Sequence, residues 1–87
     1  MANSVSARKR VRQSAAANSR NRWRKRNIHD SVKAFEAAVH AGDRGKASEV
    51  YRSTARLLDR VAAKGTIHRN TAARKKSRLA ARLNSMK

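Results

Sequence analysis

The fold is decided by residues 47–62, which read ASEVYRSTARLLDRVA. Apolar and small side chains recur along this stretch at helical spacing. They are Ala47, Val50, Tyr51, Thr54, Leu57, Leu58, Val61 and Ala62. The charged residues Arg52, Arg56, Asp59 and Arg60 lie opposite, and Glu49–Arg52 and Arg56–Asp59 have the spacing of i,i+3 ion pairs. Because an apolar face this wide can contact two neighbours at once, the stretch predicts the central helix of a bundle.

Two glycine-containing breaks flank this segment. Gly42-Asp43 and Gly65-Thr66 each pair a glycine, suited to the left-handed position after a helix, with a residue that can cap the next helix. Asn70-Thr71 is an alternative cap for the third helix. With 87 residues, no proline and three glycines, the chain favours one domain built of long helices. The sequence predicts an all-α three-helix bundle, with helices near residues 6–41, 44–64 and 67–85.

The first predicted helix is apolar only in its second half. Ile28, Val32, Phe35 and Val39 form one narrow stripe, and the corresponding upstream positions are mostly polar or basic. Basic residues surround the helix upstream of Ile28, and a helix that is polar all round has no protein core to rest on. We therefore predict a long first helix, about 50 Å in all, whose N-terminal half protrudes from the bundle.

The third predicted helix has three faces. They are an apolar stripe (Ala72, Leu79, Leu83, Met86), a basic arc (Arg74, Lys75, Arg78, Arg82) and a small-residue face (Ala73, Ser77, Ala80, Ala81). The small residues have two explanations. Either they serve helix propensity, since Ala is the best helix former, or they let a phosphate backbone approach the helix closely. Lys76 lies close to the apolar stripe, where its stem can cover the core while its ammonium group stays outside.

Charge is sorted along the chain, whose net charge is +18. Residues 1–26 hold nine basic residues and no acidic one, residues 27–63 hold six basic and five acidic, and residues 64–87 hold eight basic and none acidic. This pattern predicts a single domain in which residues 1–26 are a basic extension that orders on a polyanion and residues 27–87 form the bundle. Two alternatives are disordered, solvated tails and, for residues 1–26, an organellar transit peptide.

The sequence offers few residues suited to catalysis or to holding a metal ion or cofactor. The chain has no cysteine, its three histidines are scattered in sequence, and it contains no glycine-rich phosphate loop. No apolar run approaches the length of a membrane span. The acidic residues fit helix surfaces and caps better than a general base. We therefore expect no enzymatic activity, no cofactor, no metal site, no small-molecule substrate and no membrane partner.

Nucleic-acid binding has stronger support. Lys and Arg placed on phosphates release condensed counterions, which dominates affinity, and the planar guanidinium of Arg suits phosphate well. Trp23, between Arg22 and Arg24, fits either stacking on an unpaired base or packing on arginine stems at the bundle edge. Composition does not separate RNA from DNA, so a DNA-compacting, histone-like protein is the alternative. A membrane-active peptide is disfavoured because the basic ends lack a bulky apolar face.

Two segments carry a family resemblance. Residues 64–84 read KGTIHRNTAARKKSRLAARLN, and Met1-Ala2-Asn3 is followed at 6–13 by SARKRVRQ. With the Ala41-Gly42-Asp43 break, these segments resemble the bacterial small ribosomal subunit protein S-twenty family over essentially the whole chain. Residues 14–18, SAAAN, are less basic than that family leads one to expect, so contacts there are expected to be fewer.

The resemblance implies a structural, non-catalytic protein whose long first helix runs into RNA. It implies direct binding to the 5′ domain of small-subunit (16S) ribosomal RNA as an early-assembling component. The expected partners are this RNA and the assembled small subunit, without homo-oligomer formation, in the cytoplasm. It also implies that residues 1–26 belong to the mature protein, which counts against a transit peptide.

We expect the RNA-binding residues to lie on the first and third helices. On the first helix they are Arg8, Lys9, Arg10, Arg12, Arg20, Arg22, Arg24, Lys25 and Arg26. On the third they are His68, Arg69, Asn70, Arg74, Lys75, Lys76, Arg78 and Arg82.

Overall fold

The computed structural model describes residues 5–86, which form three α-helices: α1 (Val5–His40), α2 (Arg44–Ala63) and α3 (Arg69–Asn84). The predicted all-α fold with a long first helix is confirmed. Residues 1–4, which carry part of the N-terminal motif, and Lys87 lie outside the described residues.

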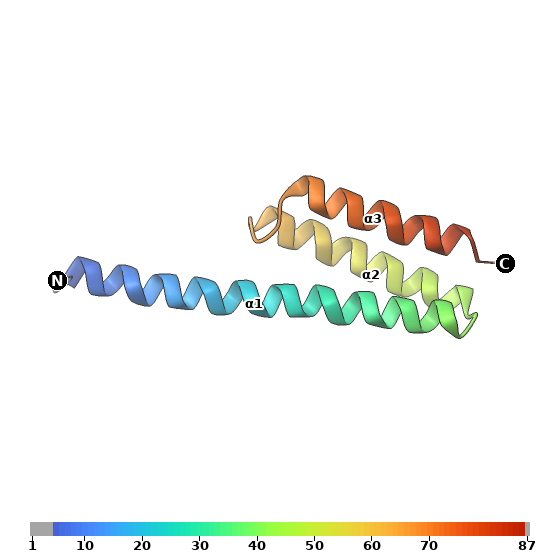
Figure 1. Ribbon diagram of the computed structural model, residues 1–87, viewed down its shortest axis with the longest axis horizontal. Coiled ribbons are helices and arrows are strands. Elements are labelled where there is room, and N and C mark those ends of the chain that lie inside the picture. The colour runs from blue at the N-terminus through green and yellow to red at the C-terminus, as the bar shows by residue number, and fades with distance from the viewer. Residues whose placement is uncertain (1–4, 87) are drawn as a thin grey trace.

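The helices lie side by side, but only along half of α1 (Figure 1). α2 packs against both α1 and α3, whereas α1 and α3 make only marginal contact with each other. The prediction that α2 is the central helix is therefore confirmed. The N-terminal half of α1 extends beyond the other two helices, and the molecule measures 62 × 22 × 16 Å. Its radius of gyration of 17.4 Å exceeds the value of about 12 Å for a compact chain of this length.

Both predicted glycine breaks end a helix in the same way. Gly42 and Gly65 adopt φ angles of +72° and +80°, in the left-handed region that a side chain disfavours. After α1, the Gly42 N–H donates to the Val39 carbonyl at 3.0 Å and the Asp43 N–H to the Ala38 carbonyl at 3.1 Å. The equivalent bonds after α2 reach Ala62 and Val61. These paired bonds satisfy carbonyl groups that would otherwise be orphaned at the helix end.

One predicted helix cap is confirmed and one is wrong. The Asp43 carboxylate accepts from the Lys46 N–H at 3.0 Å and caps α2. The cap of α3 is His68, whose Nδ1 accepts from the Asn70 N–H at 3.0 Å, and not Thr66 or Asn70-Thr71. Thr66 still belongs to the turn that closes α2, and His68 is extended, so α3 begins later than predicted.

The core is formed mainly by residues of the three predicted stripes, with Ala38 in addition. Its buried apolar residues are Ile28, Phe35, Ala38, Ala47, Leu58, Val61, Ala72 and Leu79. The rings of Phe35 and Tyr51 lie 6.4 Å apart in a tilted arrangement, which joins α1 to α2. Thr54 is fully buried, but its hydroxyl donates to the Val50 carbonyl at 2.8 Å and also contacts the Ser31 hydroxyl on α1. Because this polar group is satisfied, it costs the α1–α2 interface little.

Candidate nucleic-acid interface

The first part of the candidate interface is the α1 arm, residues 5–20, which extends past α2 and α3 (Figure 1). At 1.5 Å per residue its length is about 24 Å. The side chains of Arg8, Lys9, Arg10, Arg12 and Arg20 are all exposed on it. None of them forms an ion pair within residues 5–86. The arm therefore offers cations on several sides of one helix, as the sequence predicted.

A polar contact ties the base of this arm to the bundle. The Arg24 guanidinium donates to Thr66 Oγ1 at 3.2 Å and to Asn21 Oδ1 at 3.3 Å. The Thr66 hydroxyl in turn donates to Asn21 Oδ1 at 2.9 Å. Arg24 is half-buried, whereas Arg22, Lys25 and Arg26 are exposed. Arg24, predicted as an RNA ligand, is thus engaged within the protein.

The sequence did not predict the contact between Asn21 and Thr66. Asn21 lies seven positions before Ile28, so it continues the line of the core-facing stripe toward the N-terminus. That position was a usable signal, although the side chain is polar. The contact brings the turn between α2 and α3 against residues 21–24 of α1. As a result, the beginning of the C-terminal basic segment lies against the end of the N-terminal basic segment.

The start of α3 lies at this junction. His68, Arg69 and Asn70 are all exposed there. The His68 ring serves as the helix cap, so one of its nitrogens is already occupied by the Asn70 N–H. An α-helix N-terminus carries a partial positive charge, which adds to the charge of Arg69. These three predicted residues therefore add polar and positively charged groups at the end of the bundle from which the α1 arm extends.

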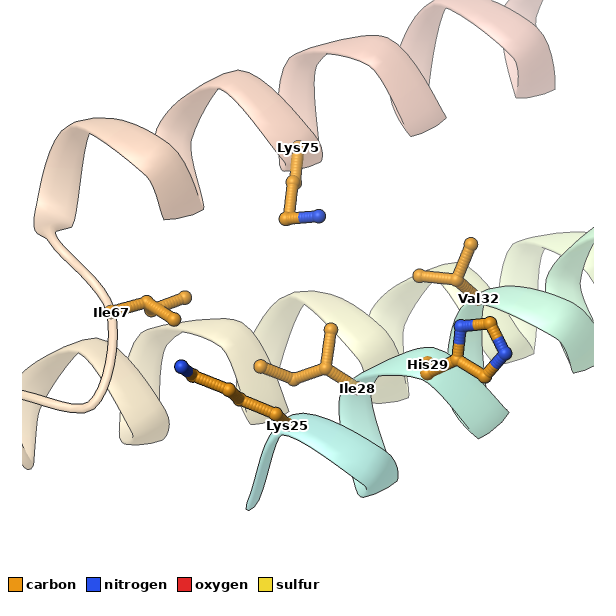
Figure 2. Close-up of a pocket in the computed structure, with 6 residues that line it drawn as sticks. All are labelled: Lys25, Ile28, His29, Val32, Ile67 and Lys75. Carbon is orange, nitrogen blue, oxygen red and sulfur yellow. The ribbon is translucent and has the colours of Figure 1, made fainter. Parts of the chain in front are cut away.

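A shallow groove separates α1 from α3 over the face that α2 does not cover. Its apolar surface comes from Ile28, Val32 and Ile67, with Lys25 on α1 and Lys75 on α3 beside it (Figure 2). Lys75 points from α3 toward the groove, and the ammonium group of Lys25 points toward Ile67. Farther along, Lys75, Arg78 and Arg82 border the groove opposite Glu36. Cations on both sides of a groove suit a phosphate backbone lying along it.

Ion pairs divide the basic residues of α3 into two groups. Lys76 Nζ lies 2.7 Å from Asp59 Oδ1 on α2, and Arg82 Nη1 lies 3.1 Å from Glu36 Oε1 on α1. The charges of these two predicted RNA ligands are therefore partly matched within the protein. Arg69, Arg74, Lys75 and Arg78 form no ion pair among residues 5–86 and are exposed.

The ion pairs predicted within α2 are wrong. Glu49–Arg52 and Arg56–Asp59 do not form, and Asp59 pairs with Lys76 instead. Asp59 projects toward the side on which α3 packs, so an interhelical partner replaces the local one. The predicted position of Lys76 beside the core is consistent with its half-buried side chain.

The described residues offer no second kind of site. Across residues 5–86, no three His, Asp or Glu side chains gather closely enough to hold a metal ion. Within the same residues, no helix is long and apolar enough to cross a membrane. What the structure does assemble is a set of exposed cations along α1, at the α2–α3 turn and on α3. Such an arrangement has the charge that complements a polyanion.

Comparison with known proteins gives the family of the chain. The family model described as Ribosomal protein S20 matches residues 2–84. The small ribosomal subunit protein bS20 of Paraburkholderia phytofirmans is 44% identical over 86 residues, covering 99% of this chain and 94% of its own length. The protein of the same name from Mycobacterium tuberculosis is 49% identical over 86 residues, covering 99% of this chain and all of its own. The chain therefore belongs to the ribosomal protein S20 family.

Proposed function

We propose that this protein is a structural component of the small ribosomal subunit in the bacterial cytoplasm and binds 16S ribosomal RNA directly. The observation that carries the proposal is the α1 arm, an exposed helix with five cations and no acidic residue. Its relatives bear the name of a small ribosomal subunit protein. The S20 family is non-enzymatic, which confirms the prediction that the chain is not an enzyme.

The arm explains how a small protein can bind a large RNA. Because its cations point in several directions, RNA can surround the arm instead of touching a single face. Each cation placed on a phosphate releases condensed counterions, so affinity grows with the number of contacts and falls with salt. Without RNA the same charges repel one another along the helix. We propose that residues 1–26 gain their stable order on the RNA.

The predicted contact residues divide by their surroundings. The exposed cations of the arm, together with Arg22, Lys25, Arg26, Arg69, Arg74, Lys75 and Arg78, are the proposed direct phosphate ligands. His68 and Asn70 add polar contacts beside them at the start of α3. Arg24, Lys76 and Arg82 have partners inside the protein, and we assign them a shared role: they position the binding helices and add charge to the surface.

The test is a salt titration with two matched variants. One variant replaces Arg8, Arg10 and Arg12 with Gln. The other makes the same replacement at Lys33, Arg52 and Arg56, which are also exposed but lie where α1 and α2 pack together. Both remove three charges. In filter binding to 16S ribosomal RNA, the arm variant should flatten the slope of log K against log salt by about 2 to 3. The control variant should leave the slope nearly unchanged.

Two outcomes would contradict the proposal. Equal effects of the two variants would mean that net charge, and not the arm, attracts the RNA. Equal or tighter binding to double-stranded DNA of the same phosphate content would favour the DNA-compacting alternative. Reconstitution of small subunits with and without the protein then checks whether it occupies a place in the particle.

A further inference from the structure

Trp23 lies on the surface, although a side chain this large and apolar is more often found in a protein core. It is the only tryptophan in the chain, and 65% of its surface is exposed. It lies on α1 where the arm joins the bundle, directly before the half-buried Arg24, which is hydrogen-bonded to Thr66. A large exposed indole adds nothing to the packed core, so its use must be sought outside the protein.

A hollow of about 230 Å³ opens beside this indole, between α1 and the C-terminal half of α2. Leu57 and Val61 of α2 supply its apolar lining. Trp23 and Asn27 border it from α1, and the basic residues around it are Arg24, Arg60 and Lys64. No acidic residue lines it. This hollow shares no lining residue with the groove between α1 and α3, so it is a separate feature.

We propose that Trp23 and this hollow hold one unpaired nucleobase of the ribosomal RNA, a proposal that rests on the function proposed above. A base has two apolar faces and a polar edge, and recognition of unpaired bases commonly combines aromatic stacking with hydrogen bonds to that edge. The indole supplies the stacking surface. Leu57 and Val61 supply an apolar seat that the base can cover.

The polar groups of the hollow suit the rest of a nucleotide. The Asn27 side chain is half-buried and makes no hydrogen bond within residues 5–86, so both its amide donor and its amide acceptor are available to a base edge. Arg60 and Lys64 are exposed and form no ion pair, so they can meet the phosphates on either side of the base. Arg24 is held by Thr66 and Asn21, which fixes one wall.

The competing occupant is an apolar side chain from a neighbouring protein. The charge of the hollow decides between them, because three cations and no carboxylate surround it. An apolar side chain would leave these cations unmatched, whereas a nucleotide brings its own phosphates. The surface therefore fits a nucleotide better than a peptide.

The test uses Trp23→Ala, Trp23→Phe and Trp23→Leu in the full-length protein, with purified 16S ribosomal RNA as the probe. Stacking contributes enough per base that Trp23→Ala should weaken binding by roughly 5- to 150-fold. Phe should restore most of the affinity because it keeps a stacking face, and Leu should not. The salt slope should stay as in the wild type, since no phosphate contact is removed.

His40→Ala is the matched control. His40 is also an exposed ring-bearing residue of α1, but it lies at the C-terminal end of that helix, outside the proposed RNA-binding residues, so its loss should leave the affinity unchanged. Because Trp23 is the only tryptophan, its fluorescence reports this site alone. Binding of the RNA should quench the emission and protect the indole from acrylamide.

The outcomes distinguish failure of the nucleobase site from failure of the proposed RNA-binding function on which it rests. If the wild-type protein fails to bind 16S ribosomal RNA, the proposed function fails. If it binds and Trp23→Ala binds equally well, or Leu restores affinity as well as Phe, the nucleobase site is overturned while RNA binding stands. Protection of the indole only after other ribosomal proteins are added would assign the hollow to a protein partner and also overturn the proposal.

Discussion

Two pairs of cations on α3 can be removed separately, and the structure predicts opposite consequences. Arg74→Ala with Arg78→Ala removes two exposed charges that form no ion pair within the described residues. Lys76→Ala with Arg82→Ala removes the same charge from the same helix, but breaks the contacts with Asp59 and Glu36. Alanine keeps helix propensity high in both variants. The comparison therefore holds net charge constant and changes only the surroundings of the residues.

The expected magnitudes follow from those surroundings. If Arg74 and Arg78 each hold one phosphate, their loss should flatten the salt slope by about 1.4 to 1.8 and leave the melting transition in place. Each ion pair of Lys76 or Arg82 is partly exposed and contributes about 0 to 1 kcal/mol to folding. The second variant should therefore lose up to about 2 kcal/mol of stability and change the slope less.

The assay is filter binding to 16S ribosomal RNA at several salt concentrations, with thermal unfolding followed by circular dichroism. An unaltered slope for the Arg74 and Arg78 variant would remove α3 from the RNA-binding surface and leave α1 alone with it. If both variants changed the salt slope equally, the division of the α3 cations into ion-paired and unpaired groups would be refuted.

Three further measurements test the fold and its order. Leu58→Ala should lower the free energy of unfolding by about 2–5 kcal/mol, because Leu58 is fully buried on the central helix; an unchanged melting curve would contradict the packing. Amides of residues 5–20 should exchange rapidly in the free protein and slowly with 16S ribosomal RNA, since no other helix covers the arm; strong protection without RNA would be the contrary result. His68→Ala should cost about 0.5–2 kcal/mol in urea unfolding by removing the cap of α3, and His68→Asn should recover most of it; equal losses would argue against capping.

Much of the fold could be predicted because its signals are local. The broad apolar face of α2 is spread over only a few turns, and it gave the central helix directly. Gly42 and Gly65 marked the helix ends because each is the left-handed residue two positions past the last residue of its helix. These features depend on residues close together in the chain, where spacing alone carries the information.

The wrong predictions for Thr66 and Asp59 both depend on residues far apart in the chain. Thr66 could be taken for a cap because its partner Asn21 lies 45 positions away. Asp59 was predicted to pair with Arg56, because its actual partner Lys76 lies 17 positions further on and comes within reach only when α2 and α3 pack. The candidate site shows the same division. Its cations could be predicted from composition. Which of them remain unpaired, and that the α2–α3 turn contacts residues 21–24, follows only from the folded arrangement.

The continuity of α1 has a mechanical consequence. The packed half and the arm belong to one helix without an internal glycine or proline, so no hinge separates them. Once the arm is ordered on RNA, its direction and that of the bundle are no longer independent. Arg8 and Lys25 then sit about 25 Å apart along one rigid axis. If the proposed function holds, two RNA segments bound at these points would be held at a set spacing and angle, and the protein would act as a strut between them.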